Sequence, residues 1–560
     1  MRYCRLAGVT GFARAVNMTM RHTTTLRLAA LALAAALAGC GGGKPAGIAT
    51  SELVVSYGAS EPKSLLPASA NEEFSVDVLH ALFATLMEWD DNMQPVELAA
   101  ESVTSTDNKV WTIKLKPGWT FHNGQPVTAD DYINAWNAGA WGPNATDANY
   151  FFSKIEGYDA LNPADAKKAP TAKKLKGLVK KDELTFEVTL KEPYVNFKSM
   201  LGYTPFMPLP KVAFKDLANN QIDPQFLEAP IGQGPFRMKG VWRHDVGIEM
   251  VRNDAYTGPH KPQIAGLNFR IYQTLTTQYQ DLLAGQLDVV PQLPVESLGT
   301  VRADLGDRYI QSMGSSIQII AFPTYDKRYA KLDVRKAISM AIDRDQISRT
   351  IFADTQKPLR SFVAPFLPGF RANTCGEACE YNPKKAKELF DAAGGAAAVG
   401  GRIELAYNVD GGHRASMEAT CNQIRANLGV ECLGNPVPKF ADLLIKARNK
   451  ESMGAFRMGW VADYPVLENY LAPLYSTNGS SNYYGYSNPE FDRLLAAGDR
   501  AATPAESLKL YQQAEDLLAR DLPVLPVREM PNNFGISTRV ANVELDPFRR
   551  PRWHKVTAAP

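Results

Sequence analysis

The hydrophobic pattern changes its period along this chain, and that change limits the folds open to it. Residues 110–116 and 183–190 alternate apolar and polar side chains, which is typical of half-buried β-strands. Residues 333–342 carry apolar side chains at helical spacing, and residues 269–290 predict a strand, a helix and a strand. The sequence therefore predicts α/β material on both sides of a β-rich insertion.

The first residues indicate export rather than fold. Basic residues precede a short apolar run, residues 28–37, and small residues follow it, as in a secretory signal. Leu37-Ala38-Gly39-Cys40 resembles the lipobox of bacterial lipoproteins, which implies cleavage before Cys40 and a lipid on its sulfur. The alternative is an ordinary signal with a chance cysteine. We predict a signal peptide at residues 1–39 and a lipidated, flexible tether at residues 40–50.

Charge and motif content exclude several classes of function. The chain has 61 basic and 59 acidic side chains, a net charge of +2, and we expect no binding of nucleic acid. Neither His-Glu-x-x-His nor Gly-x-Ser-x-Gly occurs, and only seven histidines are present, so we expect no enzyme, no cofactor and no metal site.

Four cysteines follow the tether, and in an exported chain they predict two disulfides. Three pairings are possible. We favour the two local pairs over a zinc site because no CxxC spacing is present. The favoured pairs are Cys375 with Cys379 and Cys421 with Cys432.

Residues 456–465 place one carboxylate, Asp463, between the aromatic residues Trp460 and Tyr464. An isolated carboxylate beside aromatic rings can hold a primary ammonium group. The alternative is an Asx turn, because Asp-Tyr-Pro is also good turn chemistry. Spacing alone favours the turn, and other parts of the chain change that balance.

Several segments together resemble bacterial extracellular solute-binding proteins of family 5, the oligopeptide- and dipeptide-binding class. Each segment is weak alone, but their joint order is specific and spans nearly the whole mature chain. They are residues 107–131, residues 232–236, residues 333–344, residues 381–386 and residues 459–464.

The resemblance implies a two-lobed α/β periplasmic-binding-protein fold of the class II or cluster C type, with an extra β-rich domain. Ligand is held between the lobes when they close. We expect lobe I to comprise residues 51–90, 200–300 and 521–560. The β-rich domain would be residues 91–199, and lobe II would be residues 301–520.

The resemblance also assigns roles to individual residues. Asp463 corresponds to the aspartate that receives the peptide α-amino group, and Trp460 and Tyr464 would line the cleft. Three basic residues are candidates for the peptide carboxylate, and the alternative for each is a surface charge. These candidates are Arg457, Arg448 and His413.

The expected function is capture of peptides in the periplasm of a Gram-negative-type envelope. The partners would be the membrane permease subunits of an ABC transporter, and we expect a lipid-anchored monomer. One alternative is the same fold with another cargo, namely murein peptide, haem or a nickel chelate. Another is an envelope lipoprotein without a transport role.

Overall fold

The computed structural model describes residues 48–70, 72–165 and 167–560. The predicted signal peptide, Cys40 and most of the tether lie outside these residues. Residues 49–559 form one compact unit. Within these described ranges, no helix is both long enough and apolar enough to cross a bilayer. The same residues contain no group of three or more His, Cys, Asp or Glu side chains arranged for a metal ion.

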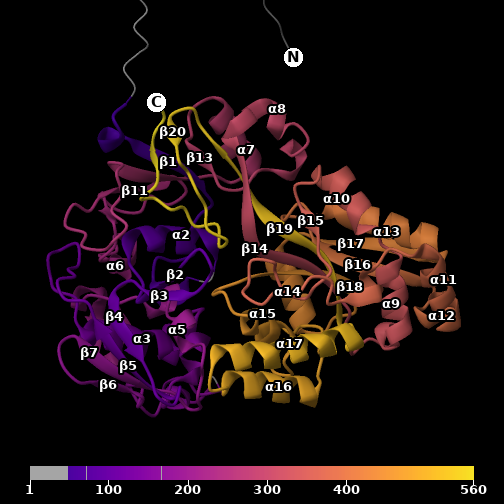
Figure 1. Cartoon of the computed structure of the whole chain (residues 1–560), viewed down its shortest axis with the longest axis horizontal. Helices are drawn as coiled ribbons and strands as arrows, with labels where there is room; N and C mark the ends of the chain where they lie inside the picture. Colours follow the sequence, from indigo (N-terminus) through magenta and orange to yellow (C-terminus); the bar gives the residue numbers. More distant parts are fainter. Residues whose placement is uncertain (1–47, 71, 166) are drawn as a thin grey trace, which may run out of the picture. The chain divides into compact units, whose positions relative to one another are not determined.

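An eleven-stranded sheet runs through both predicted lobes (Figure 1). Ten strands follow one path, and β15 (Lys357–Pro358) pairs with β19 at its side. In order, the path is β10 (Phe236–Met238), β11 (Gly247–Arg252), β12 (Gly266–Ile271), β1 (Val54–Ala59), β13 (Val289–Val290), β19 (Val524–Ile536), β14 (Tyr309–Ala321), β18 (Ala455–Val461), β16 (Arg402–Asn408) and β17 (Glu431–Val437).

The two long strands β14 and β19 connect the halves of this sheet. The end of β19 pairs with β13 through Gly535 and Ile536, whereas its beginning pairs with β14 as far as Val524. The β14–β19 ladder is interrupted between Ser312 and Ser316, where the register shifts. The predicted boundaries assigned all of residues 521–560 to lobe I, but β19 is shared between the halves because it is long enough to reach both.

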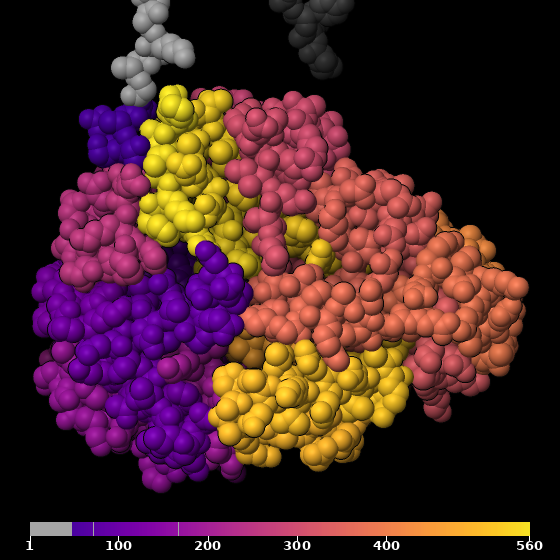
Figure 2. Space-filling view, viewed as in Figure 1, coloured from indigo at the N-terminus to yellow at the C-terminus, as the bar shows by residue number. Residues whose placement is uncertain are grey.

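A separate four-stranded antiparallel sheet forms inside residues 91–199. Its order is β4 (Ala100–Thr104), β5 (Val110–Leu115), β7 (Thr185–Thr189) and β6 (Leu178–Lys180). The predicted alternation is present in β5, where Trp111, Ile113 and Leu115 are buried. Asn108 donates to the carbonyl of Ala501 over 3.1 Å. Figure 2 shows the indigo-to-magenta part of the chain lying against yellow residues from nearer the C-terminus.

Helices of the second half pack on both faces of its strands. Ile320 and Leu405 face one core, and Ile317, Ile319 and Met458 face the other. The first core includes α9 (Leu332–Met340), α10 (Arg344–Phe352), α11 (Pro383–Ala392) and α13 (Arg414–Leu428). The second includes α14 (Phe440–Arg448), α15 (Glu468–Tyr475), α16 (Pro489–Asp499) and α17 (Pro504–Asp521).

The remaining elements are shorter or flank the main sheet. The helices are α2 (Glu73–Leu82), α3 (Ala129–Ala140), α4 (Tyr158–Leu161), α5 (Phe197–Met200), α6 (Pro224–Glu228), α7 (Leu275–Leu283), α8 (Val301–Leu305) and α12 (Gly395–Ala398). The strand pairs are β2 (Met87–Trp89) with β3 (Pro95–Glu97), β8 (Phe214–Asp216) with β9 (Gln221–Ile222), and β20 (Val540–Ala541) with β21 (Thr557–Ala558).

Both local cysteine pairs are bonded in the structure. Cys375 and Cys379 have Cα atoms 5.7 Å apart, and Cys421 and Cys432 have Cα atoms 5.1 Å apart. The second bond ties α13 to β17, two elements of the same core.

Replacing Cys421 and Cys432 together by alanine should lower the free energy of unfolding. The bond closes a loop with a sequence separation of 11, and loop-closure entropy assigns about 3 kcal/mol to a loop of this size. Guanidinium chloride unfolding followed by tryptophan fluorescence measures the change. The matched replacement of Cys375 and Cys379 should cost less, about 2 kcal/mol, because its loop is shorter. Equal midpoints for both variants and the unmodified protein would contradict this account.

Candidate functional site

Asp463 lies just after β18 and just before α15, where the chain leaves the main sheet. Its backbone N–H donates to Asn469 Oδ1 over 2.8 Å, and Asn469 Nδ2 donates back to Asp463 Oδ2 over 3.1 Å. The side chain is half-buried. Asn469, in the first turn of α15, therefore fixes the position of the carboxylate with neutral hydrogen bonds.

The electrostatic setting of Asp463 is unusual for a carboxylate. Burial raises the pKa of Asp463 to about 6, while the amide of Asn469 and the hydroxyl of Tyr203 favour the charged form and Glu468 opposes it. Across the described residues, no Lys, Arg or His forms an ion pair with Asp463. At neutral pH the carboxylate is ionised but has no cationic partner from the protein.

Two cavities meet at Asp463. One of about 150 Å³ is also lined by Tyr203, Phe548 and Arg550. The other, of about 220 Å³, is lined by Trp460, Tyr464 and Lys154 among others. These walls come from the β-rich insertion, from the C-terminal segment and from the end of β18. Asp463 thus lies in a groove between parts of the chain that are far apart in sequence.

Trp460 and Tyr464 both line the second cavity, but they differ in how deeply their side chains are buried. Trp460 is half-buried on β18, and its indole Nε1 is closed off from solvent without a hydrogen-bond partner. Tyr464 is buried, and its hydroxyl donates to Glu468 Oε2 over 2.5 Å. Tyr464 is among the residues that line the second cavity, while its hydroxyl is bonded inside the protein, so its role toward a ligand stays a prediction.

Glu468 was not identified from the sequence and organises the interior beside Asp463. Its Oε2 accepts hydrogen bonds from Tyr464 and, over 3.0 Å, from Tyr194 of the β-rich insertion. Lys154 lies 4.1 Å from the centre of the Tyr194 ring and pairs with Asp499 over 2.7 Å. This network joins the insertion to the second half of the chain. In the sequence, Glu468 ends the run Pro465-Val466-Leu467-Glu468, which follows Tyr464 directly.

Arg457 on β18 and His413 at the start of α13 come together with a second arginine, Arg528, on β19. Arg457 Nη1 donates to Asn408 Oδ1 over 3.3 Å, while Arg457 Nε has no partner. Burial, followed by the charges of Arg457 and Arg528, lowers the pKa of His413 to about 2, so His413 is neutral. Burial lowers the pKa of Arg457 to about 10, and Asp410 opposes the shift.

Arg448 stands apart from the other two carboxylate candidates. It is exposed at the end of α14, and its guanidinium lies 5.7 Å from the centre of the Tyr483 ring. The charges that lower the pKa of His413 are those of Arg457 and Arg528, and Arg448 is not among them. The structure therefore groups Arg457 with His413 and does not bring Arg448 to them.

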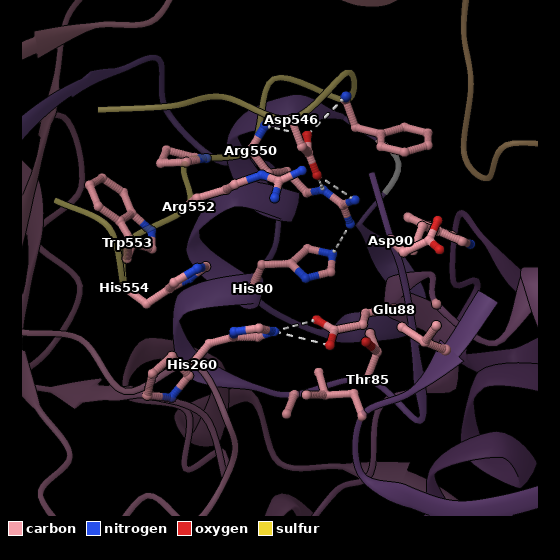
Figure 3. A pocket seen from close by; sticks show the side chains of 18 of the residues that line it. His80, Thr85, Glu88, Asp90, His260, Asp546, Arg550, Arg552, Trp553 and His554 are labelled. Carbon is pink, nitrogen blue, oxygen red and sulfur yellow. Dashed lines mark hydrogen bonds and ion pairs between the residues drawn. The ribbon is translucent and has the colours of Figure 1, made fainter. Parts of the chain in front are cut away.

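A larger cavity, of about 400 Å³, lies on the far side of Arg550 and Phe548. Figure 3 shows that several of its charged side chains, among them Arg550 with Asp546 and His260 with Glu88, are paired with one another. Arg550 donates to Asp546 over 2.8 Å and to His80 over 2.9 Å, and His260 Nε2 lies 3.0 Å from both Glu88 oxygens. Because these charges are matched within the protein, they are less available to a ligand than the carboxylate of Asp463 is.

Comparison with known proteins decides the family. The family model described as "Bacterial extracellular solute-binding proteins, family 5 Middle" matches residues 94–482. The chain belongs to this family. The oligopeptide-binding protein OppA of Bacillus subtilis is 28% identical over 482 residues, which cover 84% of this chain and 86% of that protein.

Two further proteins are similar to this chain over most of its length. Heme-binding protein A of Haemophilus influenzae is 26% identical over 550 residues, covering 95% of this chain and 98% of that protein. The structure of Haemophilus influenzae OppA in complex with the peptide RPPGFSPFR matches with a TM-score of 0.75 and 22% identity. It covers 92% of this chain and 100% of that chain. These matches confirm the predicted two-lobed solute-binding fold.

Glu468→Ala should destabilise the protein because it removes the shared acceptor of two buried tyrosine hydroxyls, which are then left only with each other, 3.3 Å apart. Each buried unsatisfied group costs roughly 1–3 kcal/mol, so we expect a loss of about 3 kcal/mol in the free energy of unfolding. Glu468→Gln keeps an acceptor oxygen and should cost less than about 1 kcal/mol. Chemical denaturation measures both. Equal losses in the two variants would show that the hydrogen bonds to Tyr194 and Tyr464 do not matter.

Proposed function

We propose that this family 5 protein captures short peptides between its lobes and delivers them to an ABC transporter. The observation that carries the proposal is the ionised, half-buried carboxylate of Asp463, which has no cationic partner among the described residues. A buried charge needs a partner, and a peptide α-ammonium supplies one together with hydrogen bonds. Trp460 adds an aromatic surface and an unpartnered N–H donor beside it.

The opposite end of the peptide would meet Arg457 and His413. Arg457 and Asp463 are six residues apart, so their Cα atoms are at most about 20 Å apart. A peptide of a few residues spans that distance with its backbone extended. Its main-chain groups can pair with protein strands whatever its side chains are, which accommodates many sequences. The charged ends then fix the direction in which the peptide lies.

The relatives support peptide cargo and include another possibility. OppA of Bacillus subtilis carries the name of an oligopeptide-binding protein, whereas a relative of Haemophilus influenzae is named for haem. Asp463 favours a ligand with a free amine, which fits peptides, including murein peptides, better than haem or a nickel chelate. We propose a binding protein without enzymatic activity, monomeric, in the periplasm and anchored through Cys40 by lipid.

Replacing Asp463 by asparagine should weaken the binding of a free-amine peptide by about 3–5 kcal/mol, the usual cost of leaving a buried charge unpaired. Mass spectrometry of the peptides that the protein retains from a pool of short peptides identifies a suitable ligand. Isothermal titration calorimetry with that ligand then measures the affinity. The same peptide with an acetylated amine should bind the unmodified protein weakly and should lose little further on Asp463→Asn.

Asp254→Asn serves as the matched control, because Asp254 is an exposed partner of Arg252. This control should leave affinity unchanged within about twofold, as is usual for surface sites. If the losses of binding free energy from acetylation and from Asp463→Asn add up, Asp463 does not bind the ammonium group.

Peptide affinity should fall on acidification between pH 7 and pH 5. The pKa of Asp463 in the free protein is about 6, and the ammonium ligand binds the ionised form, so binding lowers that pKa. Affinity is therefore full above the free-state pKa and decreases below it, by about tenfold at pH 5 relative to pH 7. Calorimetry across this range checks the result. A flat profile in the unmodified protein, or the same slope in Asp463→Asn, would contradict it.

A further inference from the structure

The cationic cluster around Arg457 on β18 contains more positive charge than one carboxylate can match. Its members are Gln318 on β14, Arg457 on β18, Arg528 on β19 and His413 at the start of α13. Gln318 lies directly opposite both Gly459 and Arg528 in the sheet. An added Cβ at Gly459 would lie 3.0 Å from Arg457 Nη2, so the guanidinium of Arg457 folds over this glycine.

Several polar atoms of this cluster are closed off and have no partner among the residues that the structure describes. They are both side-chain amide atoms of Gln318, Nε of Arg457, Nε and Nη1 of Arg528, and Nδ1 of His413. Gln318 is 0% exposed, and Arg528 and His413 are each 5% exposed. Buried polar groups in native proteins are almost always hydrogen-bonded, so a concentration of unpaired donors indicates a place where something else binds.

Arg528 is the cation that the protein itself leaves unmatched. Arg457 has Asp410 in its surroundings, although Asp410 is exposed and already bound to Asn408. Burial and the charge of Arg457 lower the pKa of Arg528, and no acidic group opposes them. The next residue, Glu529, points to the opposite face of β19 and lies across from Lys357. The Phe352 ring lies 4.1 Å from the guanidinium, which supplies attraction but no negative charge.

We propose that Arg528 binds a second carboxylate of the ligand, so that this protein selects peptides with an acidic residue at or next to the C-terminus. The inference rests on the proposed function. The terminal carboxylate is received by Arg457 and His413, and the acidic side chain by Arg528, with Gln318 donating between them. The ligand class is therefore a short peptide with one ammonium end and two carboxylates near the other end.

Matched peptide pairs test this selectivity. At the length that the peptide pool selects, we compare an alanine-based peptide ending in glutamate with one ending in glutamine, and the same pair with the acidic residue one position earlier. The better of the two acidic peptides should bind the unmodified protein at least tenfold more tightly than its amide counterpart. Moving the glutamate to the residue after the free amine should abolish this gain, which excludes a general effect of peptide charge.

Variants then assign the selectivity to Arg528. Arg528→Gln should reduce the preference to less than threefold, and Arg528→Lys, which keeps the charge, should retain a preference. Arg493→Gln is the matched control, because Arg493 is an exposed arginine paired with Glu490 on α16, and it should retain the full preference.

Three results would overturn the inference. Equal binding of acidic and amide peptides to the unmodified protein rejects the acidic preference but leaves the proposed function standing. A preference that survives in Arg528→Gln places the second carboxylate elsewhere. Binding of no peptide from the pool rejects the proposed function and this inference together. If Arg528→Gln does not fold, the comparison in the unmodified protein and in Arg528→Lys still decides.

Discussion

An ionised carboxylate without a cation is the constraint on which this account depends. A carboxyl group with a pKa near 6 rather than 3.8 has a charged form that the protein disfavours by about 3 kcal/mol. That cost is what remains after Asn469 and Tyr203 have offset part of the effect of burial with neutral hydrogen bonds. Supplying a lysine or arginine would remove the cost but also the reason for a cationic ligand to bind. The site is less stable empty than filled, as expected of a residue retained for binding.

Arg457 and Arg528 are likewise buried or half-buried charges without an ion-pair partner among the described residues, but their charge is positive. Both guanidinium groups lie on the second half of the main sheet. A zwitterionic ligand is therefore attracted at both ends and can lie in only one direction. Long strands shared between the halves of the sheet, β14 and β19, carry residues of the cationic cluster and also connect the two halves. A ligand bound at the cluster would therefore contact β14 and β19, the two strands that connect the halves of the sheet.

The sequence predicted those features that depend on local pattern. Alternation identified β5 and β7, and helical spacing identified α9, because one buried face repeats over a few residues. Residues 459–464 pointed to Asp463 because the aspartate and its aromatic neighbours are adjacent in sequence. Arg528 was not found because its surroundings come from pairing with Gln318, a residue 210 positions away in a strand that only the fold brings alongside. The bond from the Tyr464 hydroxyl to Glu468 was not predicted, because adjacency to Asp463 does not reveal side-chain hydrogen bonds.

A crystal structure of the protein with a peptide from its own selected pool tests the central claim most directly. We predict that the peptide α-ammonium nitrogen lies within hydrogen-bonding distance, about 3 Å, of a carboxylate oxygen of Asp463. An ammonium group bound by other residues, with the Asp463 carboxylate left facing only Asn469 and solvent, would contradict the account.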